Sequence, residues 1–411
     1  MTQQKVRWIT LILAVPMLIA IGWRAATLGL ADHYARRDPE RALALRPKHS
    51  LALAARAEQL AEAGQWSDAT ALARKSLQAN PLQSRAYRLL ARAAQAQGDV
   101  KQAYALYRIA ARRLPRDVPT RTWLFNHHLQ HGQAAAAMGD LDAILSAKPT
   151  LIPALTGTIH GFATQPELQP AFVEALRKSP PWRATVLSLV VQQAPDFDGT
   201  ARLMQRLRSA PEGIDSAIAN IWVERLINER RYEQAYVQWA AALVPEAREV
   251  IGNVFNGNFE LPISNRGFDW RIDATPGVRF DLLAAGGDSG AALRLAFDDQ
   301  RVPTNHLSQL LVLPPGRYQL QGRVRLEDLR SERGLVWSLT CAEDGRALLS
   351  SEAMHGNAPW RSFSAVFEIS GDACQAQWLR LQLPARIPSE QRIGGIIWFD
   401  ALRVSRQLPA G

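Results

Sequence analysis

The chain has 411 residues, of which 47% are hydrophobic and 21% charged, so it is too long for one ordinary domain and too apolar for a disordered chain. Its net charge is +10. From Ile251 onward the chain contains 17 Arg and 17 acidic residues, so the basic excess lies in the part before Ile251. This excess suits either an anionic partner or a solvated, Arg-rich helical surface. Because no motif that reads DNA or RNA is present, we expect no nucleic-acid partner.

The amino terminus has the pattern of a membrane segment. An uncharged, mostly aliphatic run extends from Trp8 to Trp23, and tryptophans at both ends are typical of the membrane interface. We expect residues 1–31 to form an uncleaved single-pass transmembrane helix, with the bulk of the chain exported. A cleaved signal peptide is the alternative, because Ala20–Gly22 and Gly29–Ala31 place small residues at cleavage spacing.

The next region repeats with a period of 34 residues. Glycine is expected in a turn that needs a positive φ, alanine where two helices pack closely, and proline where a helix pair ends. The repeated positions are Gly64, Gly98 and Gly132; Ala69, Ala103 and Ala137; and Pro47, Pro81, Pro115 and Pro149.

These residues resemble the signature of tetratricopeptide (TPR) repeats, most closely from Ser84 to Pro115. The period weakens after Pro149 and returns between Trp222 and Leu243. We therefore expect a TPR-like α-solenoid over residues 32–248. The resemblance implies a concave surface that binds a protein partner and carries no chemistry of its own.

The pattern changes after Ile251, where turn residues become frequent and apolar residues alternate with polar ones. From Arg317 to Leu326 the alternation is strict: Arg323 and Arg325 point to one side and Val324 to the other. Several such short strands predict an antiparallel β-sandwich of jelly-roll type over residues 250–408.

Three segments of this region resemble carbohydrate-binding modules of the galactose-binding-like jelly-roll kind. They are Asn256–Glu260, Phe268–Trp270 and Ile396–Val404. The resemblance implies a polysaccharide partner whose sugar rings stack on exposed aromatic side chains. The candidates are Trp270, Trp360 and Trp398, and the alternative is that each fills the core.

The same resemblance implies a structural calcium ion held by Glu260 and Asp400, with no other cofactor. Asp400 capping a strand end is the alternative.

No residue pattern predicts catalysis. His127, His128 and His131 share a helix but have no carboxylate or thiol at ligand spacing, and the pairs Asp298–Asp299 and Glu327–Asp328 lie beside arginines. A nucleophile elbow, a phosphate loop and a dinucleotide fingerprint are all missing from the sequence.

Cys341 and Cys374 are the only cysteines, and both fall in the predicted sandwich. An even count behind an export signal predicts a disulfide, although two buried thiols remain the alternative.

Together these features predict a multidomain α + β protein: a transmembrane helix, a TPR solenoid and a carbohydrate-binding-like jelly roll. We expect a non-catalytic, membrane-anchored scaffold of bacterial cell-envelope or exopolysaccharide assembly, in the inner membrane with its bulk in the periplasm. The alternatives are a polysaccharide-acting enzyme and a purely structural assembly factor without glycan contact.

Overall fold

The computed structural model describes residues 2–209, 213–284, 290–303, 305–371 and 373–407, and for residues 2–15 the backbone alone. The chain divides into two compact units. Unit 1 comprises Met1–Val190 and Ala194–Glu212, and unit 2 comprises Val191–Gln193 and Gly213–Gly411.

Unit 1 begins with the helix α1 (Thr2–Tyr34). In the part of the chain whose side chains are described, no helix combines the length and the apolar character that crossing a bilayer requires. Much of the apolar run behind the anchor prediction, from Trp8 to Val15, lies outside that part. The transmembrane helix therefore stays a prediction.

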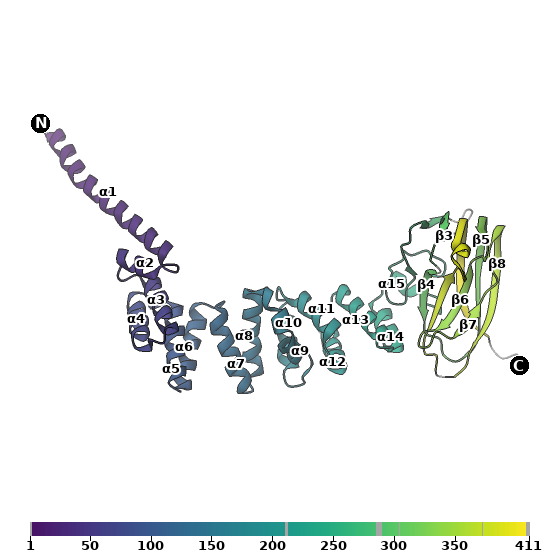
Figure 1. Ribbon diagram of the computed structural model, residues 1–411, viewed down its shortest axis with the longest axis horizontal. Coiled ribbons are helices and arrows are strands. Elements are labelled where there is room, and N and C mark those ends of the chain that lie inside the picture. The colour runs from purple at the N-terminus through teal and green to yellow at the C-terminus, as the bar shows by residue number, and fades with distance from the viewer. Residues whose placement is uncertain (1, 210–212, 285–289, 304, 372, 408–411) are drawn as a thin grey trace. The chain divides into compact units, whose positions relative to one another are not determined.

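The following helices of unit 1 form successive antiparallel hairpins, α3 with α4, α5 with α6 and α7 with α8 (Figure 1). The bounds are α2 (Pro39–Leu45), α3 (Ser50–Glu62), α4 (Trp66–Ala79), α5 (Ser84–Ala96), α6 (Val100–Arg113), α7 (Val118–Gln130) and α8 (Ala134–Ala147). Two 3-10 turns (Pro149–Leu151 and Pro153–Leu155) lead to α9 (Thr156–Thr164), α10 (Gln169–Arg177), α11 (Arg183–Gln193) and α12 (Phe197–Arg208).

The repeated residues have the structural roles that their chemistry suggests. Gly98 turns the chain between α5 and α6 with φ at +80°, a conformation that costs other residues energy. Ala69, Ala103 and Ala137 are fully buried, so the helices of each hairpin approach closely at these points. The helical part is thus compatible with a helical repeat, and its assignment to the TPR class stays a prediction.

Neighbouring hairpins are also joined by an ion-pair network. The Arg88 guanidinium on α5 contacts the Glu58 carboxylate on α3 and lies 2.6 Å from Asp117 Oδ1 at the start of α7. Burial raises the pKa of Asp117, but hydrogen bonds from Thr120 and Arg88 outweigh it and leave the pKa below its usual value.

Unit 2 starts with a helical hairpin and ends with a sandwich of two antiparallel five-stranded sheets. The helices are α13 (Ser216–Asn228), α14 (Tyr232–Ala242) and α15 (Pro245–Glu249). The first sheet has the order β1-β4-β9-β6-β7, with β1 (Arg271–Ile272), β4 (Asn305–Leu311), β9 (Gln377–Gln382), β6 (Val336–Cys341) and β7 (Ala347–Ser350).

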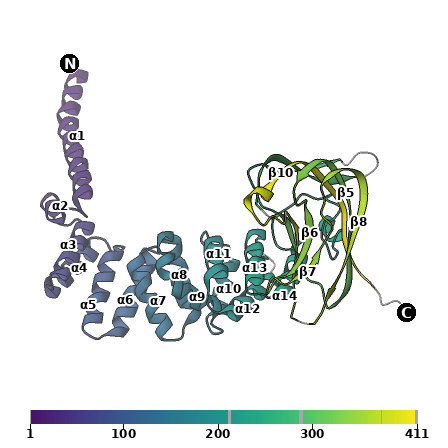
Figure 2. The same cartoon turned by 45° about the vertical axis from the view of Figure 1, so that its right-hand side comes forward.

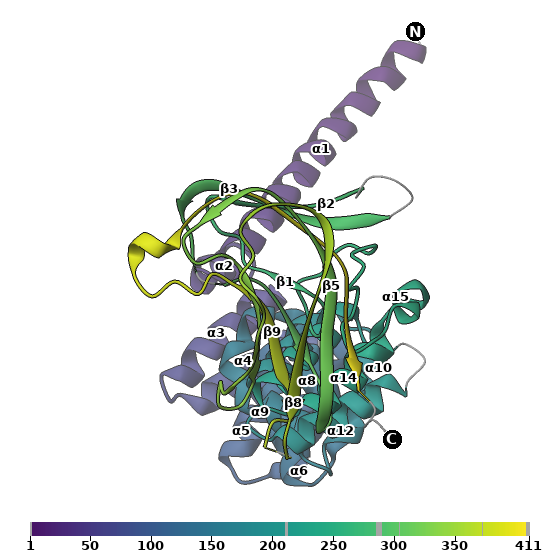
Figure 3. The same cartoon turned by 90° about the vertical axis from the view of Figure 1, so that its right-hand side faces the viewer.

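The second sheet has the order β2-β3-β10-β5-β8, of which Figure 2 labels β10, β5 and β8. Its strands are β2 (Val278–Ala284), β3 (Ala291–Arg301), β10 (Arg392–Arg406), β5 (Gly316–Ser331) and β8 (Gly356–Ile369). Its long strands curve along their length, as Figure 3 shows for β5, and β-bulges interrupt the β10–β5 and β5–β8 pairings.

The inward faces of the two sheets form one hydrophobic core, in which Trp270, Trp337 and Phe399 are fully buried. Cys341 at the end of β6 and Cys374 before β9 form a disulfide, with Cα atoms 5.4 Å apart. The bridge closes a loop over a sequence separation of 33 residues.

The hairpin α13–α14 packs directly on the loops of the sandwich. The Trp239 ring on α14 lies 4.9 Å from the Phe255 ring and 5.6 Å from the Phe268 ring, measured between centroids. Glu224 on α13 accepts hydrogen bonds from the Gly267 amide and from Arg271 Nη2. This hairpin therefore belongs to the same compact unit as the sandwich.

Candidate functional site

Two half-buried tryptophans occupy the outer face of the second sheet. Trp398 lies on β10 between the buried Ile397 and Phe399, so its side chain points away from the core. Trp360 lies on β8, and β5 runs between β8 and β10. The sheet thus presents two indole rings on one face, separated by one strand.

Arginines from neighbouring strands hold the ring of Trp398. It pairs with Arg294 on β3 and Arg325 on β5, and each guanidinium carbon lies 5.8 Å from the ring centroid, within cation–π range. Its Nε1 donates to Glu327 Oε1 at 2.9 Å. The indole is therefore fixed in orientation rather than free to rotate.

Trp360 has a similar surrounding. The guanidinium carbon of Arg323 on β5 lies 5.1 Å from its ring centroid. The sequence alternation had placed Arg323 and Arg325 on one side of this strand, and both side chains are 41% exposed. Alternation along β10 and β8 likewise sets Trp398 opposite Phe399 and Trp360 out of phase with Phe363.

Carboxylates balance these arginines. Arg294 Nη1 lies 2.9 Å from Asp281 Oδ2, Arg325 Nη2 lies 2.8 Å from Glu327 Oε1, and Arg323 Nη1 lies 3.6 Å from Asp400 Oδ2. The face is therefore near neutral and rich in both donors and acceptors. Such a surface suits hydroxyl-bearing ligands better than a bare hydrophobic partner.

Two hollows lie on this sheet, one beside Trp360 and the other beside Arg323. One, of about 510 Å³, is lined by Trp360 with Arg325, Glu327 and Asn357. The other, of about 390 Å³, lies among Gln321, Arg323, Ser362, Ser364 and Arg403. The tryptophan face therefore has polar recesses on both sides of Arg323 and Arg325.

The prediction that Trp270 stacks on a sugar is wrong. Its side chain is fully buried, its Nε1 donates to the Asn256 carbonyl oxygen at 3.0 Å, and its ring packs on Phe259 and Trp337. Trp270 fills the core, which was the alternative.

Two polar residues of the carbohydrate-binding-like segments, Asn256 and Asp269, are structural as well. Asn256 closes its loop by accepting from the Leu261 amide and donating to the Leu261 carbonyl. Asp269 accepts from the amides of Ser264 and Trp270. Burial nevertheless raises the pKa of the Asp269 carboxyl above its usual value. Asn256 and Asp269 thus fix the conformation of their loops.

The expected calcium ligands have protein partners. Glu260 Oε1 accepts from the Ala291 amide at 2.8 Å, and Asp400 Oδ1 accepts from the Ala401 amide at 2.6 Å. Among the described residues, no group of three or more His, Cys, Asp or Glu side chains is arranged to hold a metal ion. The calcium site stays a prediction with no geometric support.

The remaining acidic candidates are paired with arginines. Asp298 Oδ1 lies 2.6 Å from Arg279 Nη1, and Asp299 Oδ1 lies 3.2 Å from Arg392 Nε. Hydrogen bonding from Arg392 lowers the pKa of Asp299, which makes that carboxyl a poor proton donor near neutral pH.

The histidine cluster on α7 serves the packing of unit 1. His128 Nδ1 lies 2.8 Å from the buried Asp140 carboxylate, and His128 Nε2 lies 3.2 Å from the Tyr104 hydroxyl. His131 Nδ1 lies 2.7 Å from the His127 carbonyl oxygen. Burial, with the neighbouring His131 and His128, lowers the pKa of His127.

No protein-family model and no curated protein matches the chain. Among solved structures, a CBM4 module is 19% identical and covers 38% of this chain and 99% of its own, with a TM-score of 0.29. A CBM61 module in complex with β-1,4-galactotriose is 15% identical over 38% of this chain and 99% of its own, with a TM-score of 0.28. A family 16 carbohydrate-binding module is 12% identical over 38% and 100%, also with a TM-score of 0.28.

Proposed function

We propose that the protein is a non-catalytic scaffold that binds a polysaccharide through the tryptophan face, defined by Trp360, Trp398, Arg294, Arg323 and Arg325. The observation that carries the proposal is the pair of oriented, half-buried indoles on one face of a curved sheet, each in contact with guanidinium groups. The C–H face of a pyranose ring can pack on an indole, while the charged groups beside it hydrogen-bond the hydroxyls.

A glycan array probed with the full-length protein tests this proposal. Trp398→Ala should abolish binding to neutral glycans or weaken it at least tenfold, and Trp360→Ala should act in the same direction. Neither side chain is in the core, so both variants should keep the wild-type melting temperature.

Trp378 on β9 provides a matched control. It is also half-buried and flanked by arginines, with Arg271 at 5.5 Å and Arg380 at 5.1 Å, but it belongs to the other sheet. Trp378→Ala should leave binding unchanged. Equal losses from Trp378→Ala and Trp398→Ala would show that the tryptophan face is not the site.

Assays of the same full-length protein distinguish the proposal from the two alternative functions. Release of reducing sugar from a bound polysaccharide would replace the proposal with a hydrolase. Failure to bind any glycan would favour a purely structural assembly factor.

We further propose that the helical region docks a protein partner and that the chain is held at a bacterial inner membrane with its bulk in the periplasm. The disulfide supports export, because such bridges persist in oxidising compartments. An anchored chain should stay in the membrane fraction after a carbonate wash. A soluble product that begins near Trp23 or Asp32 would instead identify a cleaved signal peptide.

A further inference from the structure

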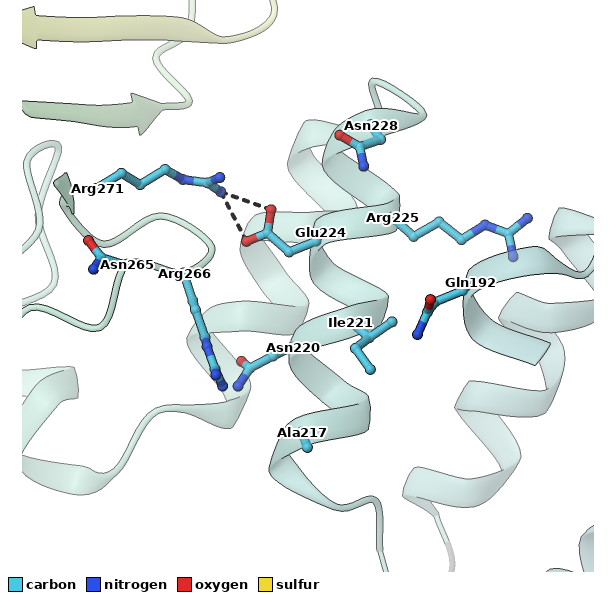
Figure 4. Close-up of a pocket in the computed structure, with 10 residues that line it drawn as sticks. All are labelled: Gln192, Ala217, Asn220, Ile221, Glu224, Arg225, Asn228, Asn265, Arg266 and Arg271. Carbon is cyan, nitrogen blue, oxygen red and sulfur yellow. Dashed lines mark hydrogen bonds and ion pairs between the residues drawn. The ribbon is translucent and has the colours of Figure 1, made fainter. Parts of the chain in front are cut away.

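A second polar cavity lies in unit 2, away from the tryptophan face, between α13 and the loop that precedes β1 (Figure 4). Its volume is about 610 Å³, within the range of roughly 300–1,000 Å³ that is typical of small-ligand sites. Polar side chains dominate its lining: Glu224, Arg225, Arg266 and Arg271, with the amides of Gln192, Asn220, Asn228 and Asn265.

The cavity wall carries more positive than negative charge. The lining includes three arginines and a single carboxylate, that of Glu224. Both oxygens of Glu224 lie 3.0 Å from Arg271 Nη2, and Oε1 also accepts from the Gly267 amide at 2.8 Å. This carboxylate is therefore satisfied within the protein, and it holds Arg271 in place.

Two arginines of the wall have unused donor capacity among the described residues. Arg266 is exposed and its side chain has no protein partner there; it extends beside Asn220 (Figure 4). Arg271 Nε is buried without an acceptor, although the same guanidinium is fixed by Glu224 and lies 5.5 Å from the Trp378 ring. Arg266 is therefore the guanidinium that is available to an anion in the cavity.

We propose that this cavity binds a uronic acid unit of an acidic polysaccharide. Its carboxylate would accept charge-assisted hydrogen bonds from Arg266, and the surrounding amides, which both donate and accept, would bind the ring hydroxyls. The lining contains no aromatic ring and only Ala217 and Ile221 as apolar residues, which argues against an apolar peptide side chain.

This site is independent of the tryptophan face and can exist without it. The distinction is chemical: stacking on indoles recognises the shape of a sugar ring, whereas the cavity recognises a negative charge. A neutral sugar should therefore not bind in the cavity, and added salt should weaken the binding of an acidic sugar there.

Calorimetric titration of the full-length protein in detergent with a galacturonic acid tetramer tests the proposal. Arg266→Gln should weaken binding about tenfold or more, as the loss of a charge-assisted hydrogen bond predicts. Asn220→Ala, a second change at the same wall, should weaken it in the same direction. Arg317→Gln is the matched control, since Arg317 is also exposed but lies at the start of β5, and it should bind like the wild type.

A neutral galactose tetramer and the Trp398→Ala variant complete the design. The neutral tetramer should not bind the cavity, and Trp398→Ala should leave the uronate affinity unchanged. The proposal is overturned if the acidic tetramer does not bind, if Arg266→Gln binds it as well as the wild type, or if Trp398→Ala removes the binding.

Discussion

His306 on β4 should make the stability of unit 2 dependent on pH. Its ring is fully buried, packs edge-on against Phe297 at 5.4 Å between centroids, and has no hydrogen-bond partner at either nitrogen among the described residues. Burial lowers the pKa of this imidazole from 6.5 to about 4, because a charged ring would lose its hydration without gaining a partner.

The magnitude follows from the difference between these pKa values. Between pH 6.5 and 4 the unfolded chain binds more protons at this residue than the folded chain, so the free energy of unfolding is highest above pH 6.5 and falls as the pH is lowered through that window. At pH 4.5 the loss from this group is about 2.5 kcal/mol. For a unit of this size that corresponds to a decrease in melting temperature of about 5–10 °C.

The prediction is checked by calorimetric melting of the wild type and of His306→Phe at pH 7.5 and 4.5. Phenylalanine keeps an aromatic ring next to Phe297 but cannot bind a proton. The melting temperature of unit 2 should fall by about 5–10 °C more in the wild type than in the variant. Because the other titrating groups are the same in both proteins, their contribution drops out of this difference. Equal decreases in both proteins would refute the assignment of this pH dependence to His306.

Three further changes test other contacts. Ala103→Leu should overpack the hairpin α5–α6 and cost about 1–3 kcal/mol in the melting of unit 1, and an unchanged melting curve would contradict the close approach of the two helices. Trp239→Ala should destabilise unit 2 by about 3–5 kcal/mol, because the ring packs on the sandwich loops; a loss confined to α13–α14, with the sandwich melting as before, would contradict that coupling. Reduction of the Cys341–Cys374 bridge should lower the denaturation midpoint of unit 2 by an amount equivalent to roughly 3–4 kcal/mol, and no shift between oxidised and reduced protein would show that the loop is held by other contacts.

The helical hairpins were predictable because their signal is local. A glycine with positive φ, a buried alanine and a closing proline each meet a requirement of one helix pair, and the repeat shows each requirement several times. The direction of Arg323 and Arg325 was predictable for a similar reason, since alternation along one strand fixes the face on which a side chain lies.

The role of Trp270 depended on contacts distant in sequence. Trp270 stands before a strand of two residues, where no alternation exists, and its burial comes from Trp337 on another strand. The packing of Trp239 on the sandwich and the cavity beside α13 likewise join segments that no sequence pattern links. For Trp270 only the tertiary contacts separated core from surface, whereas alternation along β10 already placed Trp398 outward.

The glycines of this chain obey two different constraints. At Gly98 the backbone needs a positive φ, yet a Cβ would meet no atom within 4 Å, so the restriction there is one of chirality alone. At Gly257 the φ is ordinary, but a Cβ would lie 1.9 Å from the Leu402 carbonyl oxygen, so the restriction is one of space. A D-alanine introduced by chemical ligation suits the positive φ at position 98 and should stiffen the unfolded chain there, whereas L-alanine should not be accepted at position 257 without displacing the strand that carries Leu402.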